Sequence, residues 1–208
     1  DAVQVVGKLP VDFHALGAAT LAASAHKFGG PRGMGILLAR RSPAPKPVVV
    51  GGGQERGIRS GTVDVASAAA TAAALEEATR EMAGEERRVA KLRDALIRGT
   101  LAAVPDAALT TTEPALSSHA HFVFEGADTD SLLMLLDASG IAASAGSACA
   151  AGVARPSHVL EAMGFRDAEA RGALRLTLGR TTTAEDVEGF VAVIGGIVEK
   201  ARAAGALM

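Results

Sequence analysis

One lysine of the chain, Lys27, stands where amine chemistry is expected. It belongs to a Ser-x-His-Lys-x-x-Gly-Pro-x-Gly run at residues 24–33, behind the small, weakly polar residues 21–25. We expect this lysine to be buried. A desolvated amine holds its proton less tightly and becomes a better nucleophile, so Lys27 is a candidate for a Schiff base with an aldehyde. The alternative is that its ammonium reaches past the turn into water.

The single cysteine, Cys149, is the second candidate nucleophile. Its neighbours over residues 144–152 are all small, which favours an accessible thiol in a loop that can move. No neighbour in sequence would lower the pKa of the thiol, so activation must come from elsewhere in the fold or from a substrate. The competing interpretation, a small buried hydrophobic residue, stays open.

Three other residues carry groups that suit an anionic or heteroaromatic ligand. Asp1 and Gln4 offer a carboxylate and an amide that could bind the pyridinium nitrogen and phenolic oxygen of a pyridoxal cofactor. Arg175 lies in an alternating apolar segment, where its guanidinium faces either solvent or a buried carboxylate. Loop capping for the first two residues, and a plain edge-strand arginine for the third, are the alternatives.

The glycine-rich residues 51–62 have backbone and hydroxyl donors suited to phosphate, without the spacing of a Walker or dinucleotide motif. His119 and His121 share one face of an expected strand. No cysteine or acidic residue completes a metal site there, so we interpret both as structural.

The elements that position these residues alternate between strand and helix. The sequence predicts a strand end at 1–6, strands at 21–25, 34–39, 119–124, 141–143 and 174–178, and helices at 65–82, 85–101, 130–139, from 156 to 164, and 184–203. Asp64 is expected to cap the helix at 65–82, and Thr183 with Asp186 resembles a capping box. Gly84 is expected to interrupt the long helical segment, and we place a domain boundary there.

Composition narrows the class of protein. The 208 residues carry a net charge of −2, with no Trp or Tyr, and the arginines are scattered. Nucleic-acid binding is therefore not expected. One cysteine gives no disulfide framework, and the charge-free runs are too short to span a bilayer, which predicts a cytoplasmic protein without a membrane partner. The apolar start after Asp1 is expected of a chain entered from upstream, the C-terminal part of a longer protein.

Five segments, taken together and in order, resemble the cysteine desulfurases of the class V aminotransferase family, specifically the NifS-like group. They are residues 1–10, 24–33, 51–62, 146–149 and 174–180. The resemblance implies the C-terminal portion of a fold-type I enzyme that uses pyridoxal 5'-phosphate (PLP). The expected fold is α/β: part of a PLP-binding large domain with a mostly parallel sheet at 1–83, then a smaller α/β domain carrying the cysteine loop at 84–208.

The resemblance also implies roles for the residues near the start of the chain. Lys27 would hold PLP as a Schiff base and move the substrate Cα proton. Asp1 would pair with the ring nitrogen and Gln4 with the phenolic oxygen. Ser24 and His26 would bind the phosphate, and His26 counts with Lys27 among the catalytic residues.

Further roles implied by the resemblance concern the substrate and the partners. Arg175 would bind the carboxylate of L-cysteine, and Cys149 would accept its sulfur as a persulfide, leaving L-alanine. Thr62 would reach the cofactor phosphate of the other subunit, which implies a homodimer. A sulfur-acceptor or iron–sulfur scaffold protein would take the sulfur for cluster assembly or thiolation, and a transient iron–sulfur cluster on Cys149 is the one metal interaction expected.

Two other functions are weighed against this one. The first is another class V enzyme: Cys149 in its small-residue loop argues against a non-sulfur aminotransferase, and the length of that loop favours the NifS-like group over a selenocysteine lyase. A non-catalytic module that docks sulfur-relay partners would gain if PLP does not bind. Family members carry about as much chain again before Asp1, so we expect the isolated 208 residues to be poorly active or inactive.

Overall fold

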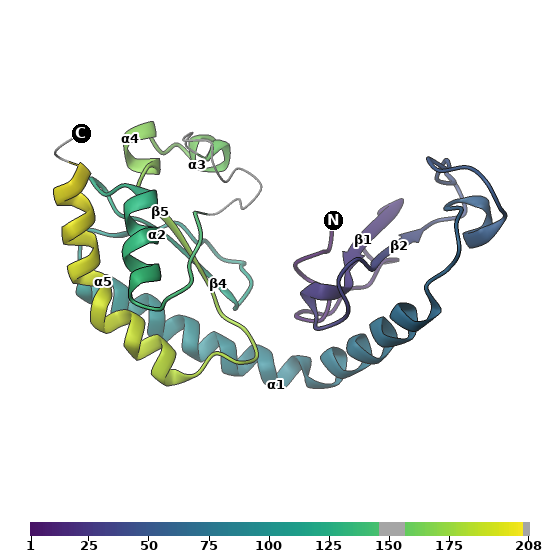
Figure 1. Ribbon diagram of the computed structural model, residues 1–208, viewed down its shortest axis with the longest axis horizontal. Coiled ribbons are helices and arrows are strands. Elements are labelled where there is room, and N and C mark those ends of the chain that lie inside the picture. Colours follow the sequence, from purple (N-terminus) through teal and green to yellow (C-terminus); the bar gives the residue numbers. More distant parts are fainter. Residues whose placement is uncertain (146–156, 206–208) are drawn as a thin grey trace. The chain divides into compact units, whose positions relative to one another are not determined.

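The computed structural model describes residues 1–145 and 157–205, in two compact units, Asp1–Glu86 and Arg87–Met208 (Figure 1). Both units combine helix and strand, which confirms the expected α/β class. The strand pairs of the described residues are antiparallel, and one isolated parallel bridge joins Val49 to Arg59.

The first unit is built around a two-stranded hairpin. Strands β1 (Thr20–Ser24) and β2 (Gly35–Ala39) pair from Thr20↔Ala39 to Ser24↔Gly35. This agrees with the two expected strands. The connection includes Gly29 and Gly33 with φ of 93° and 82°, values that glycine adopts without the steric cost of a Cβ.

The segment before this hairpin differs from the expectation. Residues 1–10 form successive turns, with the Val5 and Val6 amides donating to the Ala2 carbonyl at 3.0 and 3.1 Å, so the strand end predicted at 1–6 is wrong. Local turn bonds satisfy the backbone groups that a strand would have offered to a neighbour. The Ala2 amide donates to the Ala22 carbonyl at 2.9 Å and ties these turns to β1.

Helix α1 (Val65–Ala103) runs for 39 residues without a break. The Asp64 carboxylate accepts from the Ser67 amide at 3.0 Å and from its hydroxyl at 2.6 Å, which confirms the expected cap. The interruption expected at Gly84 is absent. One interior glycine costs only about 1 kcal/mol of helix propensity, and the strong helix formers on either side outweigh it. The boundary at 83/84 stays a prediction about domains, while the compact units divide after Glu86.

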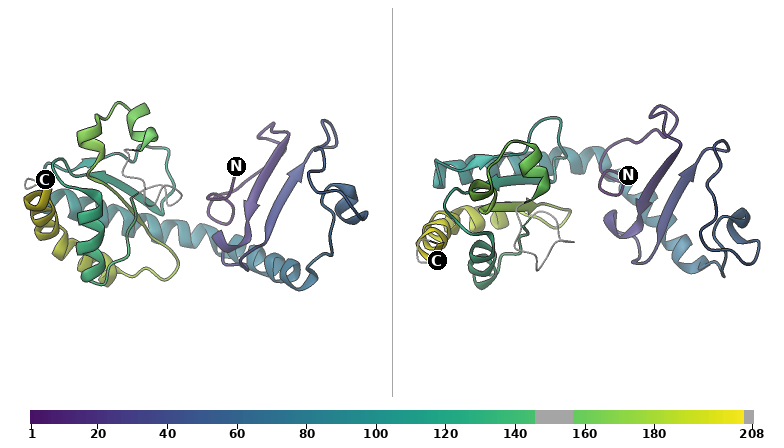
Figure 2. Two further views of the ribbon diagram at one scale, coloured as in Figure 1. Left: turned by 45° about the horizontal axis from the view of Figure 1, so that its top comes forward. Right: turned by 90° about the horizontal axis from the view of Figure 1, so that it is seen from above.

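The second unit packs helices on one face of a three-stranded antiparallel sheet. Strands β3 (Ala108–Leu109), β4 (His119–Val123) and β5 (Ala173–Thr177) lie in the order β3-β4-β5. Helices α2 (Thr129–Ala138) and α5 (Ala184–Gly205) lie against this sheet in both figures (Figures 1 and 2). The buried core joins Phe122 and Leu174 of the sheet to Leu132 and Ile194 of the helices.

The opposite face of this sheet is only partly covered. At one end Val123 packs with Leu160 of α3 (His158–Ala162) and Ala170 of α4 (Asp167–Ala170). Further along β4, His119 and His121 are half-buried on this face, since side chains alternate between the two faces of a strand. The sheet thus separates an apolar core from a face that carries polar groups.

Side chains fix the turn that leads into α5. The Thr183 amide donates to the Asp186 carboxylate at 2.9 Å and the Asp186 amide to the Thr183 hydroxyl at 3.2 Å, the expected capping box. The Arg88 guanidinium of α1 donates to the carbonyls of Gly179, Arg180 and Thr182 at 2.9, 3.1 and 2.6 Å. Hydrogen bonds from a charged donor are roughly twice as strong as neutral ones, so this turn is held firmly.

The strand expected at 141–143 is replaced by an isolated bridge between Ser144 and Arg175. Cys149 and its neighbours at 146–156 lie outside the described residues. Within the part of the chain that the structure describes, no helix combines the length and the apolar character needed to cross a membrane.

Two glycines of α1 give opposite stability predictions. An added Cβ at Gly84 meets nothing within 4 Å, so Gly84→Ala should raise the free energy of unfolding by about 1 kcal/mol through helix propensity. At Gly99 the Cβ would lie 2.5 Å from Cγ2 of Val191, and overpacking costs about 1–3 kcal/mol, so Gly99→Ala should lower it. Urea denaturation of both variants measures the difference. A loss of stability in Gly84→Ala would contradict a continuous helix.

Candidate functional site

The end of β1 turns sharply into the short helix η1 (Ala25–Lys27), which places three candidate residues together. The Ala25 amide donates to the Met34 carbonyl at 3.0 Å, and the Gly30 amide donates back to the Ala25 carbonyl at 2.9 Å. A Cβ on Gly30 would lie 2.9 Å from Cβ of Ala25, so only glycine allows this close approach. The tight turn fixes the backbone that carries Ser24, His26 and Lys27.

Ser24 and His26 form a pair of polar groups at this turn. The Ser24 hydroxyl and Nδ1 of His26 are 2.8 Å apart. When Nδ1–H of His26 donates to the Ser24 oxygen, the hydroxyl proton stays free for an anion, and a doubly protonated imidazole adds Nε2–H as a second donor. The structure therefore brings together the two residues that were expected to bind phosphate.

Lys27 is exposed in this unit, whereas Phe28, next in sequence, is buried. The expected burial of Lys27 is thus wrong for the described structure, because the turn directs Phe28 rather than Lys27 against Gly7. Lys8 is the lysine that burial affects. Desolvation lowers the pKa of its ammonium, and the positive charge of Lys27 lowers it further. Two amines therefore share one region of positive potential.

Asp1 and Gln4 lie at the same end of the unit and are exposed. The bond from the Ala2 amide to the Ala22 carbonyl holds them beside β1, two residues before Ser24. One carboxylate oxygen of Asp1 accepts from the Val3 amide at 2.8 Å. This is the loop-capping contact considered from the sequence, and the second carboxylate oxygen can serve a ligand.

The glycine-rich loop has a backbone that few side chains tolerate. Glu55 and Arg56 of η2 (Gln54–Gly57) have φ of 49° and 59°. Such left-handed conformations at non-glycine residues cluster at functional sites. The Gly61 amide donates to Oε1 of Gln54 at 3.2 Å. Thr62 is exposed, and among the described residues no hydrogen bond joins it to Ser24, His26 or Lys27.

Arg175 belongs to the second unit, in the middle of β5. Its amide donates to the Ser144 carbonyl at 2.7 Å and its carbonyl accepts from the Ser144 amide at 3.2 Å. Nε of its guanidinium is buried with no hydrogen-bond partner among residues 1–145 and 157–205. An unpartnered buried donor is costly, so this atom requires an acceptor that the described residues do not supply.

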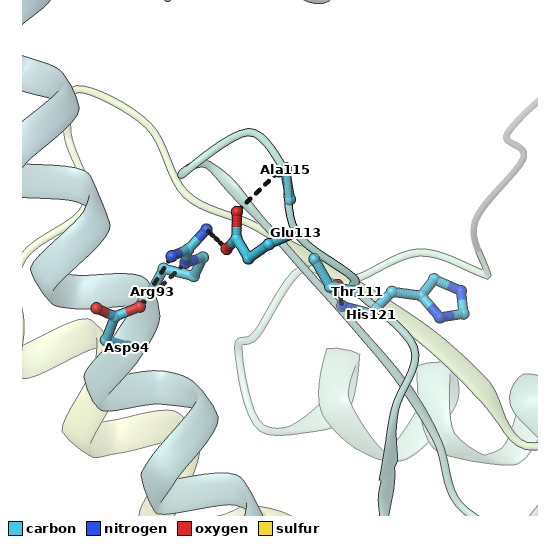
Figure 3. Close-up of polar contacts among 6 residues, drawn as sticks. All are labelled: Arg93, Asp94, Thr111, Glu113, Ala115 and His121. Atoms are coloured by element: carbon cyan, nitrogen blue, oxygen red, sulfur yellow. Dashed lines mark hydrogen bonds and ion pairs between the residues drawn. The ribbon is translucent and has the colours of Figure 1, made fainter.

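His121 stands directly opposite Arg175 in the β4–β5 register. Its Nδ1 is 2.6 Å from the hydroxyl of Thr110, and its amide donates to the hydroxyl of Thr111 at 2.8 Å. Burial lowers the pKa of His121, and the nearby Arg175 charge lowers it further. Figure 3 shows its ring on the side of the sheet away from Arg93 and α1.

The segment that carries Thr111 is itself anchored. Glu113 accepts from Arg93 of α1 at 3.2 Å and from the Ala115 amide at 2.9 Å (Figure 3). Arg93 also contacts Asp94 at 3.0 Å and is only 13% exposed. The chain beside His121 is therefore held at both ends of residues 110–115.

Sequence reasoning treated His121 as structural and missed its place beside Arg175. Only the register of β4 on β5 reveals this pairing, because 54 positions separate the two residues. No group of three or more metal-ligating side chains occurs within the described part of the chain. Cys149, the one expected metal contact, lies outside it.

The charge of Lys27 can be tested through Lys8. Lys27→Met should raise the pKa of Lys8 toward its ordinary value without reaching it, because burial still disfavours the ammonium. NMR titration of the lysine Cε and Hε signals measures this pKa. Lys46→Met, a change in an exposed loop, is the matched control and should leave Lys8 unaffected. An unchanged Lys8 in Lys27→Met would show that the two amines do not interact.

The Aminotransferase class-V family model matches residues 1–190. The chain is 50% identical over 206 residues to an IscS-like cysteine desulfurase of Mycobacterium tuberculosis, covering 98% of this chain and 52% of that protein. It is 40% identical to the cysteine desulfurase NifS of Azotobacter vinelandii, covering 97% and 50%.

Solved structures of NifS-like proteins are similar to the chain as well. A NifS-like protein superposes with a TM-score of 0.84 at 35% identity, covering 96% of this chain and 51% of the other. A NifS-like protein of Rickettsia africae superposes with a TM-score of 0.85 at 29% identity, covering 95% and 52%. The chain spans about half the length of the curated relatives it matches. It belongs to the class V aminotransferase family.

Proposed function

We propose that the protein to which this chain belongs is a PLP-dependent cysteine desulfurase that converts L-cysteine to L-alanine and transfers the sulfur to Cys149. The observation that carries the proposal is the grouping of Ser24, His26 and Lys27 at one tight turn, with Asp1 and Gln4 tied beside it. Relatives at 50% and 40% identity are named as cysteine desulfurases, which supports the same activity.

The residues of the first unit fit the chemical groups of PLP. Lys27 offers an amine to the aldehyde, and the Ser24–His26 pair offers donors to the phosphate, in a region made positive by Lys8 and Lys27. Asp1 supplies the carboxylate that a pyridinium nitrogen needs, and Gln4 an amide for the phenolic oxygen. When bound, PLP supplies an electron sink for charge that develops at the substrate Cα and Cβ.

The side chains of the chain perform the remaining steps. The Arg175 guanidinium binds the substrate carboxylate, since its Nε is buried and the described residues give it no acceptor. The Lys27 amine takes the Cα proton and later returns a proton to carbon. The Cys149 thiolate attacks the substrate sulfur, so that an S–S bond forms while the Cβ–S bond breaks. Its electron pair passes to carbon, which is protonated to give L-alanine.

The partners follow from this activity. We propose a cytoplasmic homodimer in which Thr62, exposed in its loop, reaches the phosphate of the other subunit's cofactor. The persulfide on Cys149 would pass to a sulfur-acceptor or iron–sulfur scaffold protein, with a cluster held only transiently. A selenocysteine lyase-like activity is less favoured, because the named relatives are cysteine desulfurases. A non-catalytic module would leave without a role the Lys27 turn and the buried Nε of Arg175, which has no partner among the described residues.

Borohydride reduction of the full-length protein with PLP tests the proposal. Peptide mass mapping should find a phosphopyridoxyl group on Lys27, and Lys27→Arg should carry none. With L-cysteine, the Cys149 peptide should gain one sulfur atom as L-alanine accumulates. Cys149→Ser should keep the Lys27 label and lose nearly all sulfur release.

Lys46→Arg is the matched lysine control and should keep both the label and the activity. Labelling of Lys8 in place of Lys27 would contradict the proposed Schiff base. Labelling of Lys27 without sulfur release would favour another class V activity.

A further inference from the structure

The residue facing Arg175 across the sheet is His121, and the hydrogen bonds of the two residues show how close their side chains are. The His121 carbonyl accepts from the Thr110 amide at 2.9 Å and its amide donates to Thr111, so both backbone groups point toward the β3 side. Both backbone groups of Arg175 bond to Ser144 on its other side. The two residues thus form a non-hydrogen-bonded pair, the kind whose Cα atoms are about 4.5 Å apart and whose side chains lie closer.

The surroundings of this pair favour an anion. Among the described residues, Arg175 has neither an ion pair nor a side-chain hydrogen bond, and its Nε is buried. The charged group that acts on His121 is Arg175. Among the described residues that follow β3, His121 hydrogen-bonds to Thr110 and Thr111, which are uncharged, and along β4 the next residue on its face is His119.

Thr110 can serve His121 in either protonation state. When the imidazole is neutral, the Thr110 hydroxyl can donate to Nδ1 at 2.6 Å, which leaves a proton on Nε2. When the imidazole is charged, Nδ1–H donates to the same oxygen, and the hydroxyl proton turns to the His121 carbonyl at 3.2 Å. In both states Nε2 carries a proton that it can donate, and His121 keeps its hydrogen bond to Thr110.

We propose that His121 and Arg175 together form the carboxylate-binding site, with Nε2–H of His121 donating to one carboxylate oxygen and the Arg175 guanidinium binding the other. This assignment rests on the proposed function, because the carboxylate bound here is that of the amino-acid substrate. An anion here supplies the missing acceptor for Arg175 and offsets the positive charge that disfavours protonation of His121. Binding therefore draws a proton from solvent onto His121.

The coupling is reciprocal, so it can be measured from either side. The carboxylate should raise the pKa of His121 by about one unit, which corresponds to about tenfold tighter binding to the protonated protein. Affinity should therefore rise as pH falls through the pKa of His121. L-alanine is a suitable probe and L-alaninamide its matched control, since the amide keeps the amine and lacks the carboxylate.

The experiment follows the histidine Hε1 and Cε1 NMR signals of the full-length protein, with His121 assigned by its absence in His121→Gln. L-alanine should shift the titration of His121 upward, and L-alaninamide should not. His121→Phe should bind L-alanine about tenfold more weakly at low pH. His121→Gln keeps an N–H donor without titrating, so it should retain affinity and lose the pH dependence. His119→Phe, opposite Thr177, should behave as wild type.

The experiment distinguishes a failure of the His121 site from a failure of the proposed desulfurase activity. A pKa shift of His121 with L-alanine, in a protein that releases no sulfur, would keep this site and overturn the desulfurase. Sulfur release with an unshifted His121, and with unchanged L-alanine affinity in His121→Phe, would keep the enzyme and overturn the role of His121. A downward shift of the His121 pKa would overturn it as well.

Discussion

The two-residue alternation along β4 and β5 is the constraint on which the second unit depends. It places Phe122 and Leu174 in the core and leaves His121 and Arg175 on the opposite face, in direct register. A slip of one residue would bury a guanidinium and an imidazole in an apolar core, at a large desolvation cost. The core packing that excludes other registers therefore also places the His121 and Arg175 side chains beside each other.

Helix α1 contributes rigidity as well as apolar surface. Arg88 holds three carbonyls of the turn after β5, and Arg93 holds Glu113 after β3. The first segment connects β5 to α5, and the second connects β3 to β4. Both therefore adjoin the strands that carry the polar face. An arginine suits this task because its planar guanidinium donates several hydrogen bonds from one fixed fork. The polar face is thus supported from the far side of the sheet by charged contacts, not by the core alone.

Local signals in the sequence predicted the elements well and the environments less well. The capping box at Thr183 and the cap at Asp64 follow from side chains three residues apart, which sequence displays directly. The turns at residues 1–10 were missed because their apolar composition is equally typical of a buried strand. The exposure of Lys27 and the place of His121 opposite Arg175 were missed because both depend on contacts made by distant segments. Spacing along the chain identifies residue types, whereas register and burial decide what those residues meet.

The two units use the same electrostatic arrangement. In the first unit the pKa of Lys8 is lowered by burial and by the charge of Lys27, and in the second the pKa of His121 is lowered by burial and by Arg175. Neighbouring positive groups destabilise each other, so each site is more stable with an anion beside it. A phosphate suits the first, where Ser24 and His26 add donors, and a carboxylate suits the planar guanidinium of the second. Within each unit, an anion beside the pair offsets the repulsion between its two positive groups.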